Sequence, residues 1–160
     1  MKLLTNLWKP TEGSIELFGE KLTSTSYEVL KRMGCMIEFP TFYEHLSGRE
    51  NLALHCEYMG YYNTGSIENA MELLGLNNTG KKSVREYSLG MKQRLAIALA
   101  VMHAPELLIL DEPINGLDPQ GIAEVRDTIQ RLRDERNMTI LISSHILEEL
   151  SKIATDYGII

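Results

Sequence analysis

The stretch "LLILDEPINGLDP", residues 107–119, constrains the fold more than any other part of this 160-residue chain. Four apolar residues lead directly into two carboxylates, Asp111 and Glu112, and a proline and a glycine-containing turn follow. A short apolar run bounded by turn residues is typical of a buried strand in a parallel sheet. Carboxylates at the end of such a strand cost free energy unless a cation or a metal ion meets them. This stretch therefore predicts an α/β protein with a cation-binding site at one edge of its sheet.

The rest of the chain alternates between strand and helix patterns. Strands are predicted at 35–39, 107–111 and 138–143, and helices at 26–34, 88–105, 120–136 and 146–154. A helical face at 1–8, a half-buried strand at 14–18 that turns at Gly19, and the opening of one more strand at 157–160 complete the pattern. Short apolar strands between helices predict a parallel sheet between helices, with a small antiparallel β portion near the N-terminus.

Residues 41–87 differ in character from the remainder. They read as successive helices without a strand pattern, and the clearest are "RENLALHCEYMG" and "SIENAMELLGL". Helical periodicity of this kind, placed between two strands of the predicted sheet, indicates an insertion. We interpret 41–87 as a helical subdomain within one domain that covers residues 1–160.

Composition excludes several classes of protein. The net charge of −6 argues against non-specific nucleic-acid binding through a basic face, so no nucleic-acid partner is expected. The two cysteines, Cys35 and Cys56, form neither a CxxC pair nor a metal-ligand cluster, which is typical of a reducing compartment. No apolar run is long enough to span a bilayer, and no signal peptide is recognisable. The expected location is the cytoplasm.

Four polar residues lie at the ends of three predicted strands: Glu38, Asp111, Glu112 and His145. Ligands of parallel α/β sheets bind outside the carboxyl ends of the strands, so these side chains are expected to converge on one crevice. Asp111 suits a Mg²⁺ ligand, and Glu38 suits the same metal or its water. Glu112 suits polarisation of a water that attacks phosphorus, and His145 suits a hydrogen bond to that water or to the phosphate. Taken singly, each has an ordinary alternative as a capping or solvated turn residue.

Ser88 marks a second candidate site. It is a good N-cap for the apolar helix that follows, and the start of that helix offers free N–H groups and the positive end of a helix dipole. Such a helix start is suited to binding an anion such as a phosphate.

Four motifs in order, "YSLGMKQRLAIALA", "LLILDEP", "NGLDP" and "SSH", resemble the signature motif, Walker B, D-loop and H-loop of ABC-type ATPase domains. The segment "IEFPTFYEHLSGRENL" resembles the Q-loop region of the same family. The resemblance implies a P-loop NTPase-like fold that binds and hydrolyses ATP with Mg²⁺. It implies that Asp111 binds the metal, that Glu112 is the general base and that His145 is the switch histidine.

The resemblance also implies partners. Ser88 and Gly90 would reach the γ-phosphate of ATP held by a second ATPase subunit in a head-to-tail dimer, and Asp118 would lie in the D-loop at that dimer interface. The segment 41–87 would dock on membrane-spanning permease subunits, which would place the protein peripherally on the inner face of the cell membrane.

Three positions depart from the usual family pattern. Glu38 stands where a Q-loop glutamine is usual, the signature reads Ser88-Leu89-Gly90-Met91, and Ile114 replaces a small polar residue before the D-loop. A glutamate at the first position combined with a Leu-Gly-Met signature resembles the branch that exports bacitracin- and lantibiotic-type peptides. A glutamate still ligates Mg²⁺, so Glu38 remains a candidate metal ligand and nucleotide contact.

The Walker A motif, GxxxxGK[S/T], does not occur in these 160 residues. Gly75 and Gly80-Lys81 have the spacing, but Lys82 stands where a Ser or Thr is needed, and the segment follows a helix. We expect the chain to begin just after the phosphate loop and to be inactive alone. Two alternatives stay open: a catalytically dead fragment that acts as an interaction module or donates its signature motif in trans, and an ABC protein of repair or translation.

Overall fold

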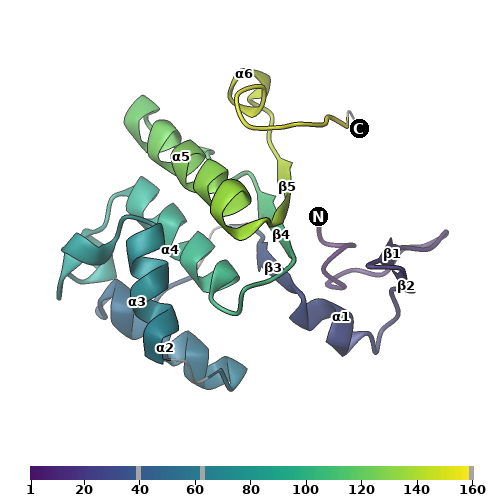
Figure 1. Cartoon of the computed structure of the whole chain (residues 1–160), viewed down its shortest axis with the longest axis horizontal. Helices are drawn as coiled ribbons and strands as arrows, with labels where there is room; N and C mark the ends of the chain where they lie inside the picture. The colour runs from purple at the N-terminus through teal and green to yellow at the C-terminus, as the bar shows by residue number, and fades with distance from the viewer. Residues whose placement is uncertain (39–40, 62–63, 159–160) are drawn as a thin grey trace.

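The computed structural model describes residues 1–38, 41–61 and 64–158 of the chain (Figure 1). The strands are β1 (Glu16–Leu17), β2 (Glu20–Lys21), β3 (Met33–Met36), β4 (Leu107–Asp111) and β5 (Thr139–Ser143). The helices are α1 (Tyr27–Lys31), α2 (Gly48–Met59), α3 (Thr64–Leu73), α4 (Leu89–Val101), α5 (Pro119–Arg136) and α6 (Leu147–Leu150), with single 3₁₀ turns η1 (Asn77–Thr79) and η2 (Val84–Glu86). In the described part of the chain, no helix is both long and apolar enough to span a bilayer.

The central sheet is parallel, with the order β3-β4-β5. Strand β4 lies in the middle, and Leu108, Ile109 and Leu110 are fully buried there. Because successive side chains of a strand point to opposite faces, Leu108 and Leu110 join the main core while Ile109 joins a smaller cluster on the other face. The apolar run that predicted a strand buried on both faces is therefore confirmed.

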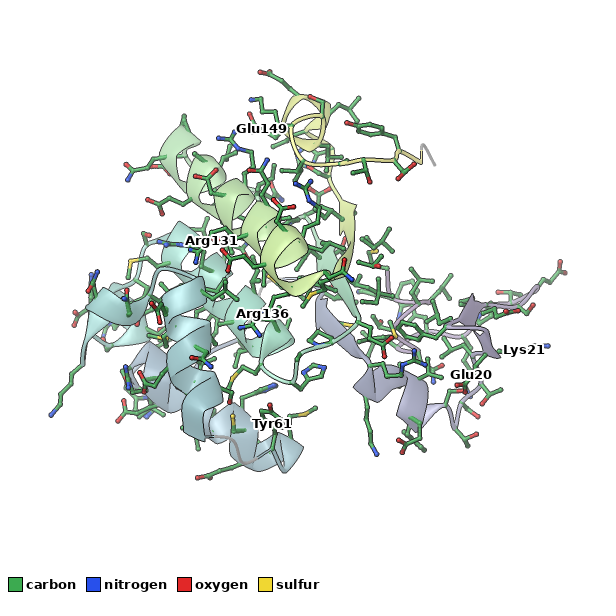
Figure 2. The ribbon with its side chains drawn as sticks, viewed as in Figure 1. Glu20, Lys21, Tyr61, Arg131, Arg136 and Glu149 are labelled. Atoms are coloured by element: carbon green, nitrogen blue, oxygen red, sulfur yellow. The ribbon has the colours of Figure 1, made fainter. Side chains whose placement is uncertain are left out.

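Each face of the sheet is covered by different elements. Helices α4 and α5 pack on each other, and α4 packs on β3, with α2 and α3 beyond α4 (Figure 1). Val29 of α1 and Met33 of β3 pack with Ile109 on the opposite face, next to the N-terminal segment. The short antiparallel hairpin β1-β2 lies at the edge of this side, and Glu20 and Lys21, which form β2, point outward (Figure 2). The structure thus confirms the predicted parallel sheet between helices with a small antiparallel portion.

The segment 41–87 holds α2, α3 and both 3₁₀ turns, and its described residues form one isolated bridge, between Ser47 and Ser83. Helix α2 begins with a capping box: the Ser47 hydroxyl accepts from the Glu50 amide, and the Glu50 carboxylate accepts from the Ser47 amide. It ends at Gly60, which has the left-handed conformation of a helix C-cap.

Several predicted boundaries are wrong. Residues 1–8 form consecutive turns rather than a helix, with the Leu7 amide bonded to the Lys2 carbonyl. The strand predicted at 35–39 runs instead over Met33–Met36, where Met33 pairs with Leu107, and residue 39 lies outside the described residues. Helix α6 has only four residues and continues as turns. The strand predicted at 157–160 is absent at 157–158, and 159–160 lie outside the described residues.

Candidate functional site

The ends of strands β4 and β5 are joined by one hydroxyl. Asp111 and Ser143 are register partners, and the Ser143 Oγ donates a hydrogen bond to the Asp111 carboxylate. The backbone N–H of Glu112 donates to both the carbonyl and the Oγ of Ser143, each at 3.1 Å. These bonds fix the two consecutive acids at the carboxyl edge of the sheet.

The Glu112 carboxylate meets the His145 imidazole across this edge. His145 Nδ1 lies 2.9 Å from Glu112 Oε2, and the side chains are 64% and 34% exposed, respectively. Because an ionised carboxylate only accepts hydrogen bonds, Nδ1 carries the hydrogen in this pair. Glu112 also has a left-handed backbone, with φ of 50°, a conformation that costs a non-glycine residue free energy and is often found at functional sites. Within the described part of the chain, no hydrogen bond reaches the second carboxylate oxygen, Oε1, so it can meet a water or a substrate.

Glu38 lies apart from this pair. Its carboxylate forms an ion pair with Lys2, and its side chain is 66% exposed. The Lys2 ammonium also lies 5.0 Å from the centre of the Trp8 ring. The contacts described for Glu38 join it to Lys2, whereas Glu112 contacts His145 and the adjacent Asp111 is held by Ser143.

Ser88, Gly90 and Asp118 line a common hollow of about 440 Å³. Ser88 Oγ accepts the Met91 amide at 3.2 Å and caps α4, while Asp118 Oδ1 accepts the Gly121 amide at 2.8 Å and caps α5. The hollow therefore receives two helix starts, both of which have positive dipole ends. The sequence predicted an anion site at the first of these starts; the structure places the start of α5 in the same hollow, which the carboxylates of Asp118 and Glu124 also line.

Helices α4 and α5 pack closely at this hollow, through glycines that line it. A Cβ at Gly90 would lie 3.5 Å from the Cα of Gly121, and a Cβ at Gly121 would lie 2.9 Å from Asp118 Oδ1. A side chain at Gly121 would therefore push the capping carboxylate away, because contacts this short are not tolerated.

Sequence reasoning missed three residues: Lys2, Ser143 and Gly121. Ser143 ends an apolar strand of the same length as β4, so pairing the two strand ends would have pointed to it. Gly121 stands three residues after a capping aspartate, the position whose amide the cap accepts. No sequence signal links Lys2 to Glu38, which is 36 residues away.

The donors at the end of β4 suit Mg²⁺ that is bound together with a phosphate. The described residues contain no cluster of three or more His, Cys, Asp or Glu side chains able to hold a metal ion by themselves. Mg²⁺ usually takes one or two protein carboxylates and completes its shell with waters and substrate phosphates. The Asp111 carboxylate, oriented by the Ser143 hydroxyl, is of the type that such a site would use.

A sequence model of the ABC transporter family matches residues 1–115. The match covers more than half of the chain, and the chain belongs to the ABC transporter family.

Individual relatives agree with this assignment. The uncharacterized ABC transporter ATP-binding protein YcbN of Bacillus subtilis (strain 168) is 55% identical over all 160 residues, which correspond to 52% of its length. The bacitracin transport ATP-binding protein BcrA of Bacillus licheniformis is 49% identical over the whole chain and 52% of its own length. The lantibiotic transport ATP-binding protein SrtF of Streptococcus pyogenes is 42% identical over the whole chain and 68% of its own length. The chain thus spans about half the length of the first two relatives.

Among solved structures, cbiO1 from Clostridium perfringens, part of the ABC transporter complex cbiONQ, superposes with a TM-score of 0.83. The match covers 95% of this chain and 63% of cbiO1 at 24% sequence identity. It shows that the two chains share a fold.

Proposed function

We propose that this chain carries the hydrolytic residues of the ATP-binding subunit of an ABC transporter. The observation that supports this most directly is the contact of Glu112 with His145 beside Asp111, at the carboxyl edge of a parallel sheet. In such sheets this edge is where ligands bind.

Each of the three residues has a role that follows from its contacts. Asp111 would hold Mg²⁺, which when bound neutralises charge on the phosphates of ATP. Glu112 Oε2 is occupied by His145 Nδ1, so Oε1 is the atom that accepts a proton from water as the water oxygen bonds to the γ-phosphorus and the bond to ADP breaks. His145 holds the carboxylate in place through Nδ1, and its other nitrogen, Nε2, accepts a hydrogen bond from a water at the phosphate. Glu38 would contribute to the same metal or water after leaving Lys2.

The hollow at the starts of α4 and α5 supports a second role, toward a partner's nucleotide. Ser88 and Gly90 would reach the γ-phosphate of ATP held by a second ATPase subunit, and Asp118 would lie at the interface of that head-to-tail dimer. Two helix starts directed at one hollow favour an anion there.

We infer that the transported substrate is a peptide antibiotic of the bacitracin or lantibiotic type. The support comes from relatives that are named as bacitracin and lantibiotic transport proteins and match the whole chain at 49% and 42% identity. Glu38 and the Ser88-Leu89-Gly90-Met91 signature agree with this branch.

We propose further that residues 41–87 form the helical subdomain that docks on membrane-spanning permease subunits, on the cytoplasmic side of the membrane. This segment exposes Tyr43, Tyr58 and Met59, with exposed fractions of 48%, 74% and 59%. The hydroxyls of the two tyrosines lie 3.2 Å apart, so they form a joint apolar and aromatic surface. Exposed aromatic side chains are enriched at protein interfaces.

A phosphate loop is absent from these 160 residues, so the chain by itself would hydrolyse no ATP. One observation favours a second candidate function, donation of the signature motif in trans. The hollow formed by Ser88, Gly90 and Asp118 is complete within the chain and needs no phosphate loop to form. Mixing the chain with a full-length relative tests this: a change in the relative's ATPase rate that disappears with Gly90→Asp supports the donor role.

The main test is to fuse a strand and a loop ending in Gly-Lys-Ser to the N-terminus and to measure ATP hydrolysis. We expect hydrolysis in the fusion, and a loss of roughly 10²–10⁴-fold with Glu112→Gln, because general-base catalysis contributes about that much. Glu135→Gln, an exposed glutamate paired with Arg131 on α5, is the matched control and should leave the rate unchanged. Turnover that survives Glu112→Gln would show that the base is another group.

A further inference from the structure

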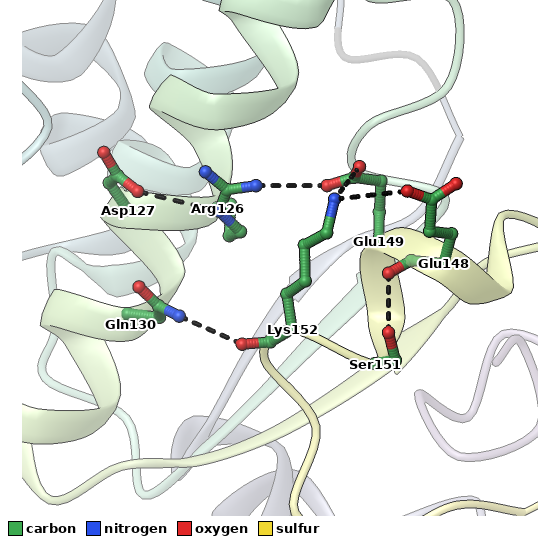
Figure 3. Close-up of polar contacts among 7 residues, drawn as sticks. All are labelled: Arg126, Asp127, Gln130, Glu148, Glu149, Ser151 and Lys152. Atoms are coloured by element: carbon green, nitrogen blue, oxygen red, sulfur yellow. Dashed lines mark hydrogen bonds and ion pairs between the residues drawn. The ribbon is translucent and has the colours of Figure 1, made fainter.

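A network of polar contacts ties α6 to the side of α5. From α5 it includes Arg126 and Gln130, and from α6 and the turn after it Glu149 and Lys152 (Figure 3). Arg133 of α5 also belongs to it, through a bond to the Ile153 carbonyl. Glu149 lies where α6 approaches α5 (Figure 2). The three α5 residues are spaced by four and three positions and therefore lie on one face of that helix. We call this set the α5–α6 network.

Glu149 is the centre of the network. Its carboxylate lies 3.2 Å from Arg126 Nη1 through one oxygen and 2.6 Å from Lys152 Nζ through the other. The side chain is 17% exposed, whereas that of its neighbour Glu148 is 85% exposed. The ammonium of Lys152, and then the guanidinium of Arg126, hold the pKa of the Glu149 carboxyl below its usual range. Glu149 is thus a charged group that two cations hold in a fixed place.

Two backbone contacts extend the same attachment. Gln130 Nε2 donates to the carbonyl of Lys152 at 3.1 Å, and Arg133 Nη1 donates to the carbonyl of Ile153 at 3.2 Å. Both carbonyls lie just after α6, where a helix end leaves acceptors unpaired.

Helix α6 itself is weakly held, although Ile153 after it is buried in the main core and Ile146 before it packs against that core. The helix is a single turn of four residues, none of them buried, and helices this short are not stable by themselves. His145 lies two residues before α6 and is itself 64% exposed, so packing does not fix its ring. Upstream, β5 anchors the segment through its pairing with β4, and downstream the anchors are the α5–α6 network and the buried side chain of Ile153.

We propose that Glu149 is a positioning residue that, by joining Arg126 and Lys152, ties the segment of His145 to α5 and keeps its imidazole on Glu112. The role of His145 in hydrolysis rests on the proposed function above, but the positioning itself does not. Because α5 starts directly after Asp118, the same helix connects the hollow at Ser88 and Gly90 with the His145 segment.

The test is the state of the His145 ring in the 160-residue chain, observed by long-range ¹H–¹⁵N NMR at a pH where the imidazole is neutral. The chain has four histidines, so the ring signals can be resolved and assigned. Contact with Glu112 requires hydrogen on Nδ1, and Glu112→Ala gives the reference for a released ring. We expect Glu149→Gln to shift the His145 signals most of the way toward that reference, with loss of hydrogen on Nδ1.

Glu148→Gln is the matched control, since Glu148 lies on the same turn and approaches Lys152 only at 3.7 Å. It should leave His145 unchanged. Arg126→Met should reproduce the effect from the α5 side, and the double variant should shift no further than either single one, because the two residues act through one contact. His103, which bonds the Met33 carbonyl at 3.1 Å, reports on the rest of the fold and should not move.

His145 signals that stay at their wild-type positions in Glu149→Gln and Arg126→Met would overturn the proposal, even if amide exchange in α6 becomes faster. If Glu149→Gln also shifts the His103 signals, the rest of the fold is disturbed in that variant. The His145 signals of Arg126→Met then decide whether the proposal holds. In the fusion with a phosphate loop, Glu149→Gln should lower kcat several-fold and leave KM for ATP unchanged. Failure of the proposed function would appear separately, as hydrolysis that survives Glu112→Gln, and the NMR result would still decide this inference.

Discussion

Ser143 and Asp111 lie opposite each other on β5 and β4, and the hydroxyl of the first donates a hydrogen bond to the carboxylate of the second. The same hydroxyl accepts the amide of Glu112 at 3.1 Å. One side chain therefore fixes the direction of Asp111 and the backbone of Glu112 together. The neighbouring acids differ in environment as a result, since Asp111 faces a hydroxyl and Glu112 faces an imidazole.

Replacing Ser143 with alanine should destabilise the chain by about 1 kcal/mol, the usual net value of a lost hydrogen bond with a partner left behind. Urea unfolding of the 160-residue chain measures this. Ser24→Ala, in an exposed position before α1, should change the free energy of unfolding by less than about 0.5 kcal/mol. Equal unfolding midpoints for the two variants would mean that the hydroxyl does not stabilise the strand ends.

His145→Ala should affect catalysis much more than stability. The ring is 64% exposed, so its removal should change the free energy of unfolding by less than about 0.5 kcal/mol. In the fusion with a phosphate loop, the same variant should lower kcat by roughly 10²-fold, because the general base Glu112 loses the partner that holds its carboxylate in place. His45→Ala, which removes an exposed histidine from the segment 41–87, is the control. A variant that unfolds easily but turns over normally would contradict this assignment.

Sequence alone predicted that Asp111, Glu112 and His145 would meet, because residues that follow parallel strands share one edge of the sheet. It did not predict that Ser143 joins them, since that contact depends on the register of β5 against β4. Nor did it predict that Glu38 pairs with Lys2, which depends on how the N-terminal turns fold back onto the sheet. Motifs locate residues near a strand end, whereas side-chain partners depend on register and loop path.

The elements of the fold divide in the same way into those that the sequence predicts and those that depend on tertiary contacts. Apolar runs placed β4 and β5 within one residue of their true bounds, because burial decides both the pattern and the strand. The helical pattern at 1–8 failed, since apolar spacing does not by itself supply the i to i−4 hydrogen bonds of a helix. Strand β3 was placed two residues too late, because Gly34 and Met33 carry little strand propensity and are recruited by pairing with β4.

Gly34 is required by the packing of β3 on α4. A Cβ at this position would lie 2.1 Å from the backbone oxygen of Ala100 and 2.9 Å from the Pro105 side chain. Gly34→Ala should therefore destabilise the chain by at least about 1–3 kcal/mol, as overpacking of a close contact does. Gly158→Ala adds the same methyl group where it meets nothing within 4 Å, and should unfold like the wild type in urea. Equal stability of the two variants would show that α4 can move away from β3 at little cost.

The capping box of α2 predicts a dependence of stability on pH. The hydroxyl of Ser47, and then its amide, hold the pKa of the Glu50 carboxyl below its usual range in the folded chain. A group whose pKa is lower when folded stabilises the fold above its unfolded pKa, and this contribution disappears as the pH falls through the folded pKa. The wild type should therefore lose stability more steeply than Glu50→Gln as the pH is lowered below about 4.5, because glutamine accepts the same hydrogen bonds without titrating. Ser47→Ala removes the hydroxyl donor, so the stability that this variant loses as the pH is lowered should be close to the loss in Glu50→Gln. Urea unfolding across this pH range measures all three chains, and parallel curves for the wild type and Glu50→Gln would show that the cap does not depend on the ionised carboxylate.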